Sequence, residues 1–176
     1  MPRSAPLDAP GVLHHVMGRG IKKRPIFLAD EDQNDFLSRH MLAEMRKKFA
    51  SRKEIDYRVG ESEQLPIPDE TMDYAFANMF LHHVESPSEA LQEMVRILKQ
   101  KGKLVITDLD EHTFEFLKTE HHDRWVGFKR EDIRQWLIEA GLKNVVADCV
   151  GENCCAQSSC GSDYASISIF VASGEK

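Results

Sequence analysis

The stretch from residue 55 to residue 108 constrains the fold of this chain more than any other part of its sequence. Ile55–Gly60 and Met72–Asn78 are short runs with the residue types of strands. Residues 86–100 have the apolar spacing of an amphipathic helix, and residues 102–108 predict a third strand. Because a strand, a helix and a strand in that order pair in parallel through a right-handed crossover, this stretch predicts an α/β fold.

The composition favours one ordinary globular domain. The chain has 176 residues, which is enough to bury a core, and a net charge of -6. The charge argues against general nucleic-acid binding, although basic residues at positions 19–24 are either solvated surface or phosphate contacts. No apolar run approaches the ~20 residues that cross a bilayer, and the first residues lack the apolar segment that a signal peptide contains. We therefore expect a cytoplasmic protein without a membrane partner, whose cysteines are reduced thiols.

Residues 1–37 differ in character from the rest. Prolines at positions 2, 6, 10 and 25 interrupt any long periodicity. Residues 12–17 and 25–29 predict two short strands, and the acidic residues 30–32 predict the start of a helix that continues to residue 50. This segment is expected to be an attachment to the main domain.

The segments after residue 108 predict two helices and two strands. Residues 114–125 predict one helix, and residues 130–140 predict a better one that Gly141 ends. Residues 145–150 predict a strand. Residues 165–172 alternate polar and apolar side chains, as an antiparallel strand does when one of its faces is polar.

A series of motifs follows in a fixed order along the chain: Gly60-Glu61-Ser62-Glu63, Leu65-Pro66, Pro68-Asp69, Met72-Asp73, Asn78, Leu81-His82-His83-Val84, Ala90-Leu91, Glu93, Arg96-Ile97-Leu98-Lys99, Gly102, Leu104 and Ala140-Gly141-Leu142. With these motifs the chain resembles the class I S-adenosylmethionine-dependent methyltransferases, in the branch that includes ubiquinone, sterol and arsenite methyltransferases. The resemblance implies an α/β, Rossmann-like sheet, mostly parallel with an antiparallel last strand, and helices on both faces. It also implies S-adenosylmethionine as the cofactor.

The resemblance assigns cofactor contacts to two strand ends. Glu61, Ser62 and Glu63 match the positions that meet the adenine, and Asn78 and Met79 match those beside the reactive methyl group. His82 and His83 follow on the next loop. A histidine there either acts as a general base or lines the pocket of the methyl acceptor, because in-line methyl transfer needs mainly positioning and desolvation.

Two further groups of residues have ligand chemistry. Asp108, Asp110, His112, His121, His122 and Asp123 suit a metal by residue type, but their spacing lacks a helical pair such as His-x-x-x-His, so no metal site is predicted. Cys149, Cys154, Cys155 and Cys160 lie in what is expected to be a flexible loop. They are candidates for a thiophilic substrate or metalloid, although the loop lacks a Cys-x-x-Cys pair.

The glycine-rich cofactor motif of this family is missing from the front of the chain. The nearest candidate, Gly18-Arg19-Gly20, lacks the preceding acid and the third glycine. The first 37 residues instead resemble the start of repeat-associated tyrosine transposases, on Pro2-Arg3, Pro10-Gly11-Val12, His14-His15-Val16, Arg19-Gly20, Ile26-Phe27, Asp30, Asp32 and Phe36-Leu37. The methyltransferase resemblance resumes near Ser38, and Asp35 is the nearest match to the ribose-binding acid.

We therefore predict a fusion of a transposase-like leader, residues 1–37, with a truncated methyltransferase domain, residues 38–176. The predicted function is methyl transfer from S-adenosylmethionine to a small-molecule acceptor. The alternatives are an inactive remnant or binding module, and a DNA-binding fragment. Residues 55–59 are expected to form an exposed sheet edge, through which the chain could form a homodimer.

Overall fold

The computed structural model describes residues 15–19, 24–29, 43, 46–47, 50–51, 55–120, 123–159, 161 and 163–176. Several sequence predictions concern positions outside this set. They are the ribose-binding acid Asp35, the thiol of Cys160, the junction near Ser38 and most of the helix expected up to residue 50. These stay predictions.

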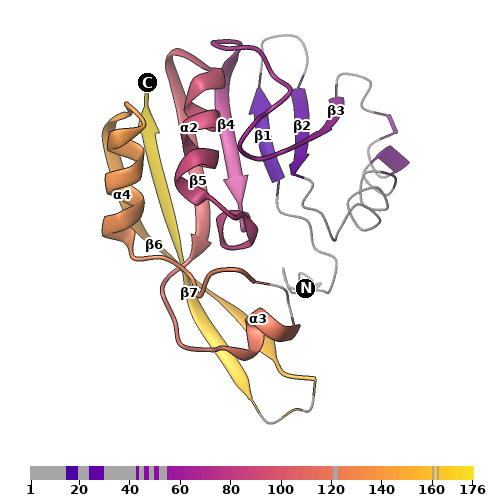
Figure 1. Ribbon diagram of the computed structural model, residues 1–176, viewed down its shortest axis with the longest axis vertical. Coiled ribbons are helices and arrows are strands. Elements are labelled where there is room, and N and C mark those ends of the chain that lie inside the picture. The colour runs from indigo at the N-terminus through magenta and orange to yellow at the C-terminus, as the bar shows by residue number, and fades with distance from the viewer. Residues whose placement is uncertain are drawn as a thin grey trace.

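One sheet organises the described residues (Figure 1). It has seven strands in the order β3-β2-β1-β4-β5-β7-β6. Their bounds are His15–Arg19 for β1, Arg24–Ala29 for β2, Ile55–Gly60 for β3, Met72–Asn78 for β4, Leu98–Leu109 for β5, Lys143–Gln157 for β6 and Tyr164–Glu175 for β7. The α/β class is confirmed, and so is the antiparallel orientation of the last strand, because β7 pairs with β5 in that sense.

The expectation of a mostly parallel sheet is confirmed for strand direction, because β2, β3, β4, β5 and β6 point the same way, but β1 runs against them as well as the last strand β7. Only β4 with β5 and β2 with β3 pair in parallel, whereas the other four neighbouring pairs are antiparallel. The connections explain the difference. A helix links β4 to β5 and permits the parallel crossover, but only residues 20–23 separate β1 from β2, too few for a crossover.

The strand β1 occupies the place between β2 and β4 and runs opposite to β4. Its residues His15 to Arg19 lie opposite Asn78 to Tyr74. Since β2 is antiparallel to β1 and parallel to β3, the strands β3, β4 and β5 all point in the same direction. The division of the chain at residue 37 stays a prediction, although β1 and β2 belong to the same sheet as β3 and β4.

Two helices pack together against the sheet. Helix α2, Pro87–Ile97, starts with proline in its first turn, where the missing N–H costs no hydrogen bond. Helix α4, Arg130–Glu139, buries Ile133 and Leu137. Both helices contribute to the main cluster of buried side chains, with β4, β5 and β7. The amphipathic spacing of both segments in the sequence is thus explained by burial of one face.

A second, smaller cluster forms where β5 and β7 continue past the main one. It contains Leu109, Ile167 and Ile169, together with Leu117 from the short helix α3, Phe116–Glu120. In β5, Leu109 lies an odd number of positions from Leu104 and Ile106, which belong to the main cluster, so its side chain points to the opposite face of the sheet. Because side chains alternate along a strand, α3 meets the sheet on the face opposite to α2 and α4.

Several element boundaries differ from the sequence prediction, and α3 is shorter than the helix expected at residues 114–125. Helix α2 ends at Ile97, and β5 begins directly after it at Leu98. Gly102 allows the bend that follows, since a Cβ there would lie 2.8 Å from the carbonyl oxygen of Lys99. Strand β6 extends through the cysteine segment that was expected to be a flexible loop. That expectation is wrong because β7 is long enough to pair with the segment up to Gln157.

Candidate functional site

Three chain segments that carry polar residues leave the sheet at one edge. Strands β3, β4 and β5 point the same way, so their carboxyl ends at Gly60, Asn78 and Leu109 lie on the same side of the sheet. Open α/β sheets bind their ligands at this edge. The segments that follow these ends are described next.

The best-defined polar contact at this edge joins Asp108 to His82. Nδ1 of His82 lies 2.6 Å from Oδ1 of Asp108, and both side chains are buried. The carboxylate also accepts backbone N–H bonds from Phe80 at 3.1 Å, Leu81 at 2.7 Å and Leu109 at 2.7 Å. Asp108 thereby fixes both the 3-10 turn η1, Leu81–His83, and the ring of His82.

These contacts keep Asp108 ionised in spite of its burial. Burial by itself raises the pKa of Asp108, but the charge and hydrogen bond of His82 and the N–H groups of Leu109 and Leu81 outweigh it and lower the pKa below its ordinary value. An ionised carboxylate can only accept hydrogen bonds, so Nδ1 of His82 carries a proton. In the neutral ring of His82, Nε2 is then the nitrogen that can accept a proton or bind a ligand.

The segment at residues 123–125 lies against this histidine turn. The backbone N–H groups of Arg124 and Trp125 donate to the carbonyl oxygen of His82 at 2.9 and 3.1 Å. The indole Nε1 of Trp125 donates to the carbonyl oxygen of Val84 at 2.8 Å. These bonds bring Asp123 close to two imidazoles, with Oδ1 at 3.9 Å from Nε2 of His82 and 3.6 Å from Nδ1 of His83.

His112 adds a further imidazole beyond the end of β5. Its Nδ1 accepts the backbone N–H of Phe114 at 3.2 Å, so in the neutral ring the proton is on Nε2. Among the residues that the structure describes, this Nε2 is the buried side-chain polar atom without a hydrogen-bond partner. Burial lowers the pKa of His112 and the nearby charge of His82 lowers it further, which favours the neutral ring.

The predicted adenine-facing residues follow β3 in a tight turn. Glu61 is exposed and Ser62 is 1% exposed. The hydroxyl of Ser62 donates to Oε2 of Glu63 at 2.5 Å, and Oε1 of Glu63 accepts the backbone N–H of Ser86 at 3.4 Å. Glu63 therefore connects this turn to the start of α2, whereas the carboxylate of Glu61 is accessible to a ligand.

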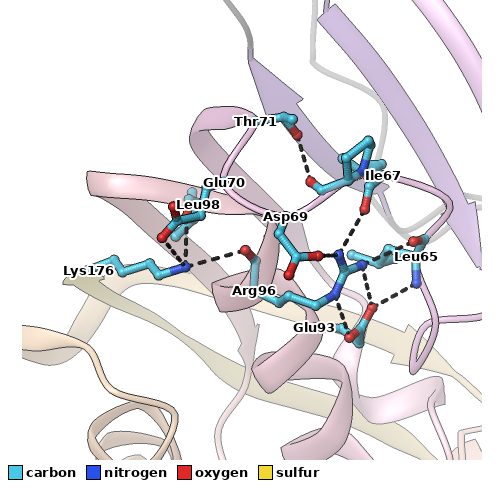
Figure 2. A network of polar contacts seen from close by, with 10 residues as sticks. Leu65, Ile67, Asp69, Glu70, Thr71, Glu93, Arg96, Leu98 and Lys176 are labelled. Carbon is cyan, nitrogen blue, oxygen red and sulfur yellow. Dashed lines mark hydrogen bonds and ion pairs between the residues drawn. The ribbon is translucent and has the colours of Figure 1, made fainter.

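A partly buried arginine holds the loop that carries these residues onto α2 (Figure 2). The guanidinium of Arg96 donates to the carbonyl oxygens of Ile67 at 3.0 Å and Leu65 at 3.1 Å. It also pairs through two bonds of 2.8 Å with Glu93, whose Oε2 accepts the backbone N–H of Leu65 at 3.0 Å. A further ion pair joins it to the exposed Asp69. The surface ion pair predicted between Glu93 and Arg96 exists, but it also fixes the loop backbone.

The residues predicted to lie near the reactive methyl group end β4. The exposed amide of Asn78 accepts a hydrogen bond from the hydroxyl of Thr107 at 2.5 Å. Met79 is 4% exposed, has a positive φ of 50° and belongs to the second cluster. Asn78 thus presents a polar group at the edge, whereas the side chain of Met79 is part of the core.

The three described cysteines do not form a common site. Cys149 and Cys155 are exposed free thiols, and the partly buried Cys154 packs against the second cluster. Because Cys154 and Cys155 are consecutive in β6, their side chains point to opposite faces of the sheet. This arrangement does not favour an ion held jointly by the adjacent pair, whereas binding of a thiophilic substrate or metalloid elsewhere in the segment stays a prediction.

Comparisons with known proteins agree with this geometry. Residues 36–106 match the family described as Methyltransferase domain. An uncharacterized protein of Methanocaldococcus jannaschii is 28% identical over 107 residues, which are 57% of this chain and 52% of that protein. The ubiquinone/menaquinone biosynthesis C-methyltransferase of Desulfotalea psychrophila is 37% identical over 71 residues, 40% of this chain and 28% of that enzyme. The chain thus spans about half or less of these relatives.

The solved structures extend the comparison to the fold. A crystal structure of an S-adenosylmethionine-dependent methyltransferase from Thermotoga maritima, described as a possible histamine N-methyltransferase, superposes with a TM-score of 0.54 at 23% identity. The match covers 76% of this chain and 70% of that protein. The chain is therefore an α/β protein. More particularly, its fold is that of the class I methyltransferases.

Sequence reasoning missed how the site is assembled. It singled out His82, His83, Asp108 and Asp123 separately. It did not predict that His82 contacts Asp108 or that Asp123 lies near both histidines. The available signal was that Asp108 ends a buried strand parallel to the one that precedes the two histidines. Carboxyl ends of parallel neighbours meet, so the pairing could have been inferred from the strand order.

Proposed function

We propose that this protein transfers a methyl group from S-adenosylmethionine to a small-molecule acceptor. The observation that carries the proposal is the common edge where the turn after Gly60, the amide of Asn78 and the Asp108–His82 pair lie together. The match of residues 36–106 to the methyltransferase domain supports it independently. Because the chain covers only part of its relatives, the whole activity is our proposal.

The residues present fit the two ends of the cofactor. The exposed carboxylate of Glu61 and the backbone after it would hold the adenine side, and the amide of Asn78 lies where the methyl end is expected. The cofactor supplies a sulfonium-bound methyl group. The protein needs to align the acceptor with it and exclude water. His82, His83 and the buried N–H of His112 would line the acceptor side.

A specific observation favours the alternative of a binding module without methyl transfer. Strand β1 runs antiparallel to β4, so Gly18 lies opposite Ala75 in the middle of the strand, away from the cofactor edge. Gly18, the first glycine of the pair nearest to the family motif, therefore does not lie at the edge where a cofactor-binding turn would be needed. Such a protein would bind ligands at the edge but would align the methyl group poorly.

Calorimetric titration with S-adenosylhomocysteine separates these possibilities. We expect binding by the unmodified chain, weakened about tenfold, which corresponds to about 1.4 kcal/mol, in Glu61→Ala. The exposed Glu111 on another loop is the matched control, and Glu111→Ala is expected to bind like the parent chain. Absence of heat at millimolar ligand would refute the proposal. Binding without methyl transfer to any of a panel of thiols, phenols and amines would favour the binding module.

We also propose that two copies of the chain associate through β3. Among the described strands, β3 is the last of the sheet and pairs on one side only, with β2. Such an edge can pair with a second copy. Sedimentation equilibrium tests this, and a monomer at all concentrations would remove the idea.

None of the helices in the described part of the chain is long and apolar enough to cross a membrane.

A further inference from the structure

A cluster of two imidazoles and a carboxylate lies beside the proposed acceptor site. Nitrogens of His82 and His83 and a carboxylate oxygen of Asp123 all lie within 4.8 Å of one another. His82 and Asp123 are 3% and 7% exposed, whereas the side chain of His83 is 30% exposed. Two of the three residues are therefore buried, and solvent can reach the cluster at His83.

The distances in this cluster are somewhat longer than those between ligands of one small ion. Zinc binds histidine nitrogen and carboxylate oxygen at about 2.1 Å, so two ligands of a tetrahedral ion lie about 3.4 Å apart. Asp123 Oδ1 lies 3.6 Å from His83 Nδ1 and 3.9 Å from His82 Nε2. An octahedral ion would bring adjacent ligands to about 3.0 Å, which fits less well. Small side-chain rotations would complete tetrahedral geometry.

A second feature supports a ligand role for His82. Its Nδ1 donates to the buried carboxylate of Asp108, and its Nε2 is directed to the side of Asp123. Metal-binding histidines commonly donate their second nitrogen to a carboxylate, which fixes the tautomer and the ring orientation. Asp108 is itself held by the N–H groups of Phe80, Leu81 and Leu109, so this support is rigid.

We propose that His82, His83 and Asp123 bind one divalent transition-metal ion of the zinc type, with Asp108 orienting His82. The sequence did not predict this site, because its ligands come from two segments 40 residues apart and lack a helical spacing. Three protein ligands leave a fourth position open, as in catalytic rather than structural zinc sites. On the exposed side of His83, that position would take a water molecule or an anionic group of a ligand.

The chemical alternative is a purely hydrogen-bonded network. Protonated imidazoles can pair with Asp123, and such a network would need no ion. The two possibilities differ in one measurable property, which is specific binding of one metal ion per chain. Metal binding is also independent of the cofactor, so the test uses metal alone.

Cobalt(II) titration of the 176-residue chain, first stripped with a chelator, provides the test. We expect one cobalt per chain, visible bands of a tetrahedral ion, and displacement by zinc. His83→Gln and Asp123→Asn should each weaken binding at least a hundredfold. Asp108→Asn should weaken it about 10- to 100-fold, as loss of an orienting partner does. His112→Gln, which alters an imidazole outside the cluster, should leave binding unchanged.

Three results would overturn the proposal. One is a cobalt spectrum like that of the free ion. Another is an intense near-ultraviolet band from cobalt bound to thiolates, which would place the ion on the cysteines. The last is wild-type affinity in His83→Gln, a variant expected to fold because this side chain is partly exposed. Titration with S-adenosylhomocysteine in the metal-free state tests the cofactor separately, so either proposal can fail alone.

Discussion

Replacement of Arg96 by lysine should loosen the loop that carries the proposed adenine contacts. Lysine keeps the positive charge but cannot form the planar fork that binds Glu93 and the carbonyl oxygens of Leu65 and Ile67 together (Figure 2). The side chain of Arg96 is 29% exposed and that of Glu93 is 18% exposed. Solvent can therefore replace only part of what is lost.

The magnitude follows from the individual contacts. Each carbonyl that loses its charged donor costs about 1 kcal/mol, the low end for unsatisfied acceptors, because water gains some access. The pair with Glu93 contributes about 1 kcal/mol at this exposure, and the pair with the exposed Asp69 adds little. The free energy of unfolding should fall by about 3 kcal/mol. For a chain of this size that corresponds to a Tm about 6–12 °C lower.

Urea unfolding followed by circular dichroism measures this change, with the m-value checked for two-state behaviour. Arg134 on α4 is exposed, and Arg134→Lys is the matched control, expected to stay within about 0.5 kcal/mol of the parent. Calorimetry should also show weaker binding of S-adenosylhomocysteine by Arg96→Lys. If Arg96→Lys and Arg134→Lys have equal stability, the loop does not depend on the fork and the reasoning is wrong.

Three further predictions concern pH, backbone geometry and thiol reactivity. The hydrogen bond from Arg96 lowers the pKa of Glu93 below its ordinary 4.5, against the opposing effect of burial. This carboxylate therefore stabilises the fold fully above that ordinary value and loses its effect as pH falls through the lowered pKa. The stability difference between the parent and Glu93→Gln should shrink from neutral pH to about pH 3, and an unchanged difference would contradict the sign. Gly127 and Gly141 both have positive φ, but a Cβ on Gly127 would lie 2.2 Å from the carbonyl oxygen of Asp110, whereas Gly141 faces open space. In urea unfolding, Gly141→Ala should cost about 1 kcal/mol and Gly127→Ala about 3 kcal/mol or more, and equal costs would show that the clash is relieved. Iodoacetamide should modify the exposed Cys149 and Cys155 faster than the partly buried Cys154 in peptide mapping, and equal rates would argue against the paired β6.

The sequence predicted the elements whose pattern reflects burial on one face. The apolar spacing of α2 and α4 and the runs in β4 and β5 arise from contacts with the main cluster, so they are visible locally. The length of β6 was not predictable in this way. Its burial pattern is mostly exposed, and only its pairing with β7 makes it a strand through the cysteines.

The direction of β1 and the polar cluster depend on distant partners. A short strand carries no signal for its orientation, which follows from the brief connection to β2 and the register with β4. The contact between His82 and Asp108 joins residues 26 positions apart. Neither residue differs locally from an ordinary surface histidine or a strand-ending aspartate, so only the assembled sheet brings them together.

The place of β7 in the sheet has a consequence for synthesis. This strand lies between β5 and β6. Two consecutive residues of β7, Ile169 and Phe170, belong to different clusters of buried side chains. On the ribosome, neither cluster can close before residues 164–175 have emerged. During that interval the apolar face of β5 stays open to chaperones or to another nascent chain. The rate at which residues 164–175 are translated should therefore influence the yield of folded protein more than the rate at which the first strands are translated.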